Sequence, residues 1–155
     1  MNIDKKQVGT IFIAAIFIVS GISFAISWNP PSENGKESAN VLKQPIANEQ
    51  RTLFMNSDIT ILTLFYLEDD GDSQKIKKEV EKLNNEIGEK MLLEEIDIRT
   101  YQSFSAEYNV KSVPVVLIRG KENINVPIRL EGSQDYSTIK EKICSTYDEK
   151  PKICV

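Results

Sequence analysis

Hydrophobic and polar positions divide this chain into three segments. The run VGTIFIAAIFIVSGISFAISW, from Val8 to Trp28, holds 21 residues without a charged side chain. The next stretch, Asn29 to Gln50, is rich in Pro, Ser, Asn, Gly and charged residues and has little to bury. From about Arg51 onward, short apolar runs alternate with amphipathic segments, as in a folded domain. The pattern predicts three parts, which are residues 1–28, 29–50 and 51–155.

The first half of the predicted domain has the pattern of a βαβ unit. The segment ITILTLFYL, Ile59 to Leu67, is uncharged and rich in β-branched and aromatic residues, which is typical of a strand covered on both faces. Apolar residues then recur at helical spacing up to Gly88, where a helix is expected to end. Those apolar positions are Ile76, Val80, Leu83 and Ile87. A second strand follows at Met91–Ile98, so we expect a parallel pair with a right-handed crossover.

The second half predicts a short helix, a hairpin and a last helix. Pro114 comes two residues into an apolar run and must lie at the start or the edge of its strand, because proline cannot donate to the ladder. A further helix is predicted before the first strand, at Ile46–Asn56. The remaining elements are a helix in Thr100–Val110, strands in Ser112–Gly120 and Asn125–Gly132 joined by a turn at Lys121–Asn123, and a helix in Ser133–Tyr147 capped by Ser133 or Asp135.

The apolar N-terminal run is long enough to cross a membrane. About 20 apolar residues span the ~30 Å hydrocarbon core of a bilayer. Lys5 and Lys6 precede the run and Trp28 ends it, which predicts a single-pass anchor with a cytoplasmic N-terminus and an extracytoplasmic domain. The alternative is a cleaved signal peptide, since small residues at Ser23 and Ala25 could form a cleavage site.

Composition excludes several classes of chemistry. The chain has no histidine, which removes Ser-His and Cys-His nucleophilic catalysis and most zinc sites. The net charge is −4 and no basic patch stands out, so nucleic acid is not an expected partner. We expect no cofactor and no resident metal.

The two cysteines, Cys144 and Cys154, both lie near the C-terminus. Outside the cell two cysteines usually pair, so a structural disulfide is expected. Three alternatives remain open, namely a redox-active pair, free thiols and pairing between chains.

Two segments resemble thioredoxin. AEYNVKSVPVVLIRGKE resembles the stretch that carries the family's cis-proline, with Pro114 at the proline and Val113 before it. LFYLEDDGDSQK resembles the strand end and the WCGPC turn that opens the active-site helix. The resemblance covers about Asp58 to Ile143 and implies an α/β thioredoxin-like fold, with a central mixed sheet flanked by helices. Its degenerate active-site turn consists of Asp70, Gly71, Asp72 and Ser73.

The departure from the family pattern decides the expected chemistry. Asp70 and Ser73 stand where thioredoxins keep their two cysteines, and the family's reaction needs a thiolate at the helix N-terminus. We therefore expect no redox reaction at this turn. Its carboxylates could cap the helix, form a partner-binding loop or hold calcium, although their spacing does not follow an EF-hand. The segment Val113–Pro114 could still hold an extended peptide, or only shape the turn.

These observations predict a membrane-anchored, extracytoplasmic thioredoxin-like domain without the CxxC pair. Its expected role is non-enzymatic: it binds a partner polypeptide near the membrane or serves as a subunit of a membrane complex. One alternative is a thiol-disulfide oxidoreductase that uses Cys144 and Cys154. Another is a calcium-stabilised binding module.

Overall fold

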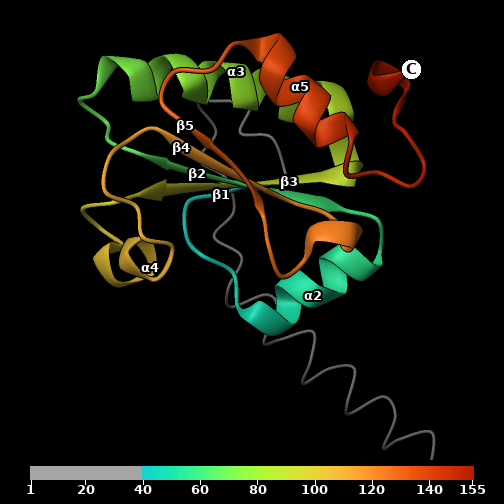
Figure 1. Cartoon of the computed structure of the whole chain (residues 1–155), viewed down its shortest axis with the longest axis horizontal. Coiled ribbons are helices and arrows are strands. Elements are labelled where there is room, and N and C mark those ends of the chain that lie inside the picture. The colour runs from blue at the N-terminus through green and yellow to red at the C-terminus, as the bar shows by residue number, and fades with distance from the viewer. Residues whose placement is uncertain (1–39) are drawn as a thin grey trace, which may run out of the picture. The chain divides into compact units, whose positions relative to one another are not determined.

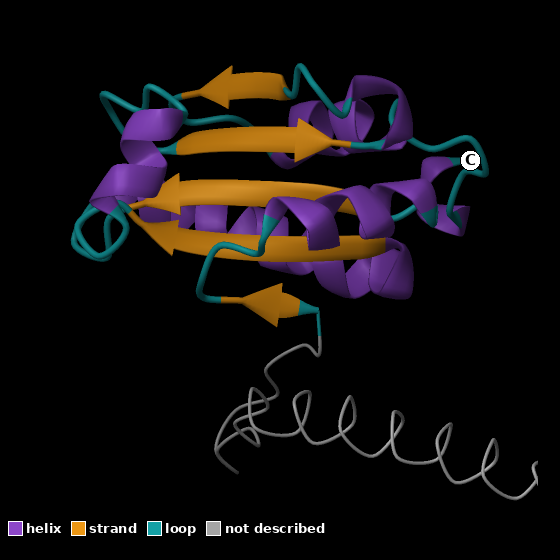
Figure 2. Cartoon of the chain, turned by 90° about the horizontal axis from the view of Figure 1, so that it is seen from below, coloured by secondary structure: helices purple, strands orange, loops and turns teal. Residues whose placement is uncertain are grey.

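A five-stranded mixed sheet forms the centre of the domain. The computed structural model describes residues 40–155. The strands lie side by side in the order β1-β3-β2-β4-β5 (Figure 2), with β1, β3 and β2 parallel and β4 antiparallel to both of its neighbours. They are β1 (Val41–Leu42), β2 (Thr60–Tyr66), β3 (Met91–Asp97), β4 (Val115–Arg119) and β5 (Ile128–Glu131). The predicted parallel pair and the predicted hairpin are both present.

Helices cover both faces of this sheet. Figure 1 shows α3 and α5 on one side and α2 and α4 on the other. The helices are α2 (Asn48–Asn56), α3 (Gly71–Ile87), α4 (Gln102–Glu107) and α5 (Tyr136–Cys144), with short 3₁₀ helices at Gly88–Lys90, Lys121–Asn123 and Lys152–Cys154. This arrangement confirms the predicted α/β thioredoxin-like fold.

The alternation of side chains along the strands produces a core on each face. All seven residues of β2 are buried, as expected for a strand covered on both sides. Leu62 and Leu64 point to the α3 and α5 side, where they pack with the predicted apolar stripe of α3. Phe65 points the other way and stacks on Phe104 of α4, with ring centroids 5.8 Å apart. The two faces together fix the register of β2.

The ends of the long helices follow from their sequence. Asp135, one of the two predicted caps, is the N-cap of α5 and accepts a hydrogen bond from the Thr138 amide at 2.7 Å. Gly88 ends α3 with a φ of 72°, a backbone conformation that side chains with a Cβ rarely adopt. Local chemistry therefore sets where α5 begins and where α3 ends.

The folded domain begins earlier than the predicted boundary at Arg51. The Leu93 amide donates to the Asn40 carbonyl at 2.9 Å, and Asn40 Nδ2 donates to the Gly88 carbonyl at 3.0 Å. Val41 then pairs beside Leu93 as the start of β1. Residues 40–50, predicted to belong to the linker 29–50, are therefore part of the domain. A two-residue strand needs only backbone hydrogen bonds, so the lack of apolar periodicity concealed it.

A buried ion pair attaches α2 to the sheet. Arg51 Nη2 lies 2.7 Å from Glu94 Oε1, and the two side chains are 4% and 0% exposed. Glu94 also accepts from the Ile46 amide at 2.9 Å and from Thr63 Oγ1 at 2.5 Å. Three donors, from α2, β2 and the loop before α2, thus meet at one carboxylate of β3, and we call the four residues the Glu94 cluster (Ile46, Arg51, Thr63 and Glu94).

The predicted membrane anchor falls outside the described residues. In residues 40–155, no helix is both long enough and apolar enough to span a bilayer. The segment Val8–Trp28 and residues 29–39 of the predicted linker precede that part of the chain. The anchor therefore stays a prediction.

Candidate functional site

The acidic turn between β2 and α3 is closed by hydrogen bonds within itself. The Asp70 amide donates to the Leu67 carbonyl at 3.2 Å, and Gln74 Nε2 donates to the Glu68 carbonyl at 2.9 Å. Asp69 pairs with Arg99, which follows β3. The turn therefore holds its shape and presents its carboxylates at the C-terminal end of β2.

Asp70 caps the helix that follows this turn, and Ser73 ties the turn to that helix. Asp70 Oδ2 accepts the Ser73 amide at 2.7 Å, and hydrogen bonds from the side chain and the amide of Ser73 lower the pKa of Asp70. Ser73 is fully buried, and its Oγ accepts the Leu67 amide at 3.3 Å. This geometry supports the helix-cap interpretation, and it turns the Ser73 hydroxyl inward instead of toward a substrate.

Val113 and Pro114 lie at the same end of the sheet as the acidic turn. Their peptide bond is cis, and β4 begins directly after it. The register pairs Phe65 near the end of β2 with Val115, so the turn after β2 and the segment before β4 are neighbours. The Pro114 carbonyl accepts the Gly132 amide at 2.9 Å, which ties this loop to the end of β5.

Val113 offers an open backbone edge. Its side chain is half-buried. Among residues 40–155, neither the amide nor the carbonyl of Val113 has a hydrogen-bond partner. An extended peptide can pair with such an edge through main-chain hydrogen bonds.

A hollow of about 500 Å³ adjoins this edge on the side of β5. Arg129 fixes its wall, because Nη1 donates to the Tyr108 carbonyl at 2.8 Å and Nε donates to Glu131 at 2.6 Å. Lys111 and Ser112 are exposed at the rim. The lining residues are Tyr108, Asn109, Lys111, Ser112, Arg129 and Glu131. Sequence reasoning missed this hollow, although the alternating PIRLEG pattern could have placed Arg129 and Glu131 on one face.

A buried carboxylate lies beneath the acidic turn. Lys77 Nζ is 3.7 Å from Glu68 in the turn and 3.3 Å from Glu95 in β3, whose side chain is 1% exposed. Burial raises the pKa of Glu95 by more than the Lys77 ammonium lowers it, and the Glu81 carboxylate adds to the rise. Lys77 thus connects an exposed acidic residue to a buried one.

This raised pKa of Glu95 predicts that the stability of the folded protein depends on pH. The unfolded chain releases the Glu95 proton near the ordinary pKa of 4.5, before the folded protein does, so the folded state loses stability as pH rises through this interval. The Glu95→Gln variant lacks this titration. We expect the wild-type unfolding free energy to fall relative to the variant as pH rises above about 4.5, measured by urea unfolding. The exposed Glu141→Gln serves as control, and a difference that stays constant with pH would contradict the prediction.

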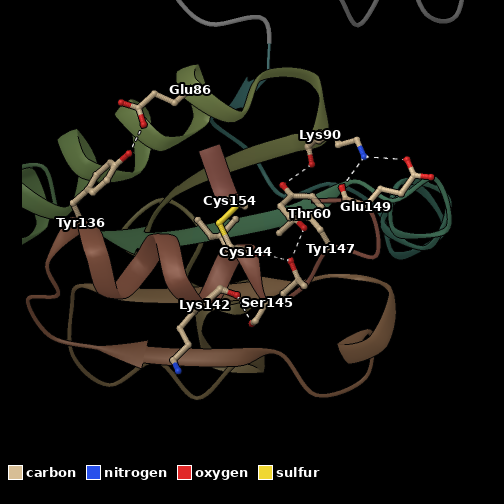
Figure 3. Close-up of a disulfide and its surroundings, with 12 residues drawn as sticks. Thr60, Glu86, Lys90, Tyr136, Lys142, Cys144, Ser145, Tyr147, Glu149 and Cys154 are labelled. Carbon is tan, nitrogen blue, oxygen red and sulfur yellow. Dashed lines mark hydrogen bonds and ion pairs between the residues drawn. A yellow bond between two sulfur atoms is a disulfide. The ribbon is translucent and has the colours of Figure 1, made fainter. Parts of the chain in front are cut away.

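Cys144 and Cys154 form a disulfide (Figure 3). It joins the last residue of α5 to the 3₁₀ helix Lys152–Cys154, with the two Cα atoms 5.4 Å apart. Cys154 packs against the core on the α3 and α5 side. The bond therefore attaches the C-terminal tail to the domain.

The disulfide is remote from the acidic turn. Thr146 Oγ1 lies 2.7 Å from Thr60 Oγ1 at the start of β2, and the buried Tyr147 donates to the Lys90 carbonyl at 2.9 Å just before β3. The acidic turn follows the other end of β2, about 20 Å of strand away. The structure brings the turn and the Val113–Pro114 segment together, and it separates the cysteines from both.

No metal centre is evident in the described part of the chain. In residues 40–155, no three Asp, Glu, Cys or His side chains gather in a way that could hold a metal ion. Three of the four carboxylates of the acidic turn are engaged, Asp70 with the helix end, Asp69 with Arg99 and Glu68 with Lys77, while Asp72 is exposed. They do not converge on a common point, so the turn offers no ready calcium site.

Comparisons with known proteins agree with this geometry. A thioredoxin mutant from Halobacterium salinarum NRC-1 superposes with a TM-score of 0.58 and 23% identity, over 76% of this chain and 100% of that one. A chloroplastic thioredoxin z gives 0.56 and 21%, over 68% of this chain and 94% of that one. At these identities the likeness shows the fold alone, and no curated protein sequence matches the chain. The family model for thioredoxin matches residues 43–145, which is more than half of the sequence, and the chain therefore belongs to the thioredoxin family.

Proposed function

We propose that this chain is a membrane-anchored member of the thioredoxin family that binds a polypeptide without redox chemistry. The observation that carries the proposal is the unpaired backbone of Val113 beside a turn that has no thiol. Main-chain pairing supplies affinity for an extended segment, and neighbouring side chains supply specificity.

The chemistry of the turn supports a binding role. Disulfide exchange needs a thiolate nucleophile, and the dipole of the helix N-terminus serves to lower the pKa of such a thiol. Asp70 occupies that N-cap and Ser73 is buried behind it. Cys144 and Cys154 are bonded to each other at the opposite end of β2. An oxidoreductase built on these two cysteines would have to work without the turn and without the Val113 edge.

The membrane location rests on the sequence. The uncharged run from Val8 to Trp28 matches the thickness of a bilayer core, and Lys5 and Lys6 favour a cytoplasmic N-terminus. The disulfide supports the same orientation, because disulfides persist in oxidising compartments outside the cytoplasm. We therefore place the domain on the extracytoplasmic side.

The charges around the Val113 edge indicate what the partner carries. Exposed carboxylates stand on one side of the edge, at Glu68, Asp69 and Asp72. An extended segment with lysine or arginine near this acidic rim would be attracted and oriented by it. On the other side of the edge, the exposed Lys111 would favour an acidic or neutral side chain over the hollow.

Site-specific photocrosslinking tests the proposal. A benzoylphenylalanine residue is placed at the exposed Ser112, or at the exposed Glu141 on α5 as control, and the full chain is irradiated in its native membrane. We expect a discrete polypeptide adduct from position 112 and none from position 141. Asp69→Lys combined with Asp72→Lys, which leaves the Asp70 cap in place, should lower the adduct yield about tenfold through repulsion of a basic segment.

Two results would count against the proposed site. One is equal labelling from positions 112 and 141, which would indicate non-specific contact. The other is an adduct from position 112 whose yield is unchanged by the two charge reversals, which would remove the acidic rim from the recognition surface.

A further inference from the structure

Arg119, at the end of β4, is a buried cation without an acceptor. The residue is 4% exposed, and its guanidinium lies over the Tyr108 ring with 4.8 Å between Cζ and the ring centroid. Within residues 40–155 its guanidinium donates no hydrogen bond and forms no ion pair. A buried charged group in that state is strongly unfavourable, and nearly all buried polar groups in proteins find a partner.

Arg51 contributes further unused donors on the same face of the sheet. Its Nη2 is occupied by Glu94, while Nε and Nη1 are buried without an acceptor, as is Nη1 of Arg119. The register pairs Arg119 with Ile61 and Leu117 with Thr63, and alternation places Arg119 on the same face as Thr63 and Glu94. Three buried guanidinium nitrogens therefore lack acceptors in one layer of the domain, between the sheet and helices α2 and α4.

The charges in this layer do not balance. Two buried guanidiniums, Arg51 and Arg119, share a single buried carboxylate, Glu94. Glu107 on α4 is exposed to solvent and compensates only at a distance. Burial lowers the pKa of Arg119 and is the largest effect; Tyr108 opposes it, the positive charge of Arg51 lowers the pKa further, and Glu94 and Glu107 oppose by less. One positive charge is left without a counterion inside the protein.

We propose that a small monovalent anion, chloride or one of similar size, binds in this layer. The free N–H groups of Arg119 hold it, and the charge of Arg51 attracts it. A monovalent ion fits because a single positive charge is left over, and a small one fits because both arginines are almost fully enclosed. The ion would join α2 and α4 to the sheet, so it acts as a structural ligand apart from the Val113 edge.

Anion-dependent stability tests this site. The unfolding midpoint of the full chain in non-ionic detergent is measured in sodium chloride and in sodium gluconate at equal ionic strength, because gluconate is too large to enter. Binding to the folded state alone predicts that the unfolding midpoint rises with the logarithm of the chloride concentration above the dissociation constant, by roughly 5 °C at about ten times that constant. Line broadening of chloride-35 resonances by the wild-type protein, reversed on unfolding, gives an independent readout.

Matched variants assign the effect to Arg119. Arg119→Met should lose the chloride-dependent rise in midpoint, whereas Lys142→Met, which removes one exposed positive charge from α5, should keep it. If Arg119→Met does not fold, the wild-type midpoints in chloride and in gluconate, together with the chloride-35 line widths, still decide whether the anion binds. Equal wild-type midpoints in chloride and gluconate, or a chloride response that survives in Arg119→Met, would overturn the proposal.

Discussion

Replacing Arg51 with methionine is expected to lower the free energy of unfolding by about 3–5 kcal/mol. The variant leaves the Glu94 carboxylate fully enclosed, with only the Ile46 amide and the Thr63 hydroxyl as donors. Removing one partner of a buried ion pair exposes the other to the full cost of desolvation. The loss should appear as a lower urea midpoint with an unchanged denaturant slope.

A second substitution distinguishes this cause from simple loss of packing. Arg51→Met combined with Glu94→Leu removes both charges, so this double variant should recover most of the stability that Arg51→Met alone loses. Lys142→Met, which breaks the exposed pair with Glu141, should cost less than about 1 kcal/mol. Additive effects of the two core substitutions would show that the charges are not coupled.

Removing the disulfide is expected to lower the free energy of unfolding by roughly 2–3 kcal/mol. Cys144 and Cys154 are 10 positions apart, and the crosslink restricts the unfolded chain over that loop. The double variant Cys144→Ser with Cys154→Ser should show this loss in urea unfolding. The wild-type protein under a reductant should lose a similar amount.

The same variant separates a structural disulfide from a catalytic one. The cysteines lie far from the acidic turn. At temperatures where the double variant is still folded, the yield of the photocrosslink from position 112 should therefore equal that of the wild type. Neither the variant nor the wild type should catalyse the reduction of insulin disulfides by a thiol. Mixed disulfides with other proteins, trapped through Cys144 in a Cys154→Ser variant, would instead favour the oxidoreductase alternative.

The long periodic segments of this chain were predictable because burial alone determines them. Ile59–Leu67 has no charge and is rich in β-branched residues, which suits an inner strand, and the stripe ending at Gly88 has the spacing of an amphipathic helix. The proline at position 114 correctly placed the start of β4. In each case one strong local preference agreed with the tertiary packing.

The parts that sequence reasoning missed depend on contacts between distant residues. β1 is two residues long, and only its pairing with β3 reveals it. Glu94 and Glu95 are consecutive residues of a strand that is covered on both faces, so their side chains are buried on opposite sides of the sheet. This pair of acidic residues in a predicted inner strand is a signal in the sequence that each carboxylate needs a cation. Their partners, Arg51 and Lys77, lie 43 and 18 positions earlier, and no local pattern identifies them.

The same limit applies to the candidate site. Asp70 and Pro114 could be matched to known positions because the thioredoxin resemblance carries both. The hollow beside Val113 could not be predicted, since Arg129 of β5 and the turn after α4 meet only in the folded chain. The contact of the Ser73 hydroxyl with the Leu67 amide also required the structure, because the burial of Ser73 depends on the packing of α3.

In the proposed membrane-anchored protein, the early start of the domain at β1 would limit how far the domain can reach from a bilayer. With Val8–Trp28 as the proposed anchor, only residues 29–39 remain between the membrane and the pairing of Asn40 with β3. Even fully extended, eleven residues span roughly 40 Å, which is less than the thickness of many membrane-protein ectodomains. The domain would therefore meet only partners that belong to the membrane or come within one domain diameter of its surface, and its local concentration for them would be high.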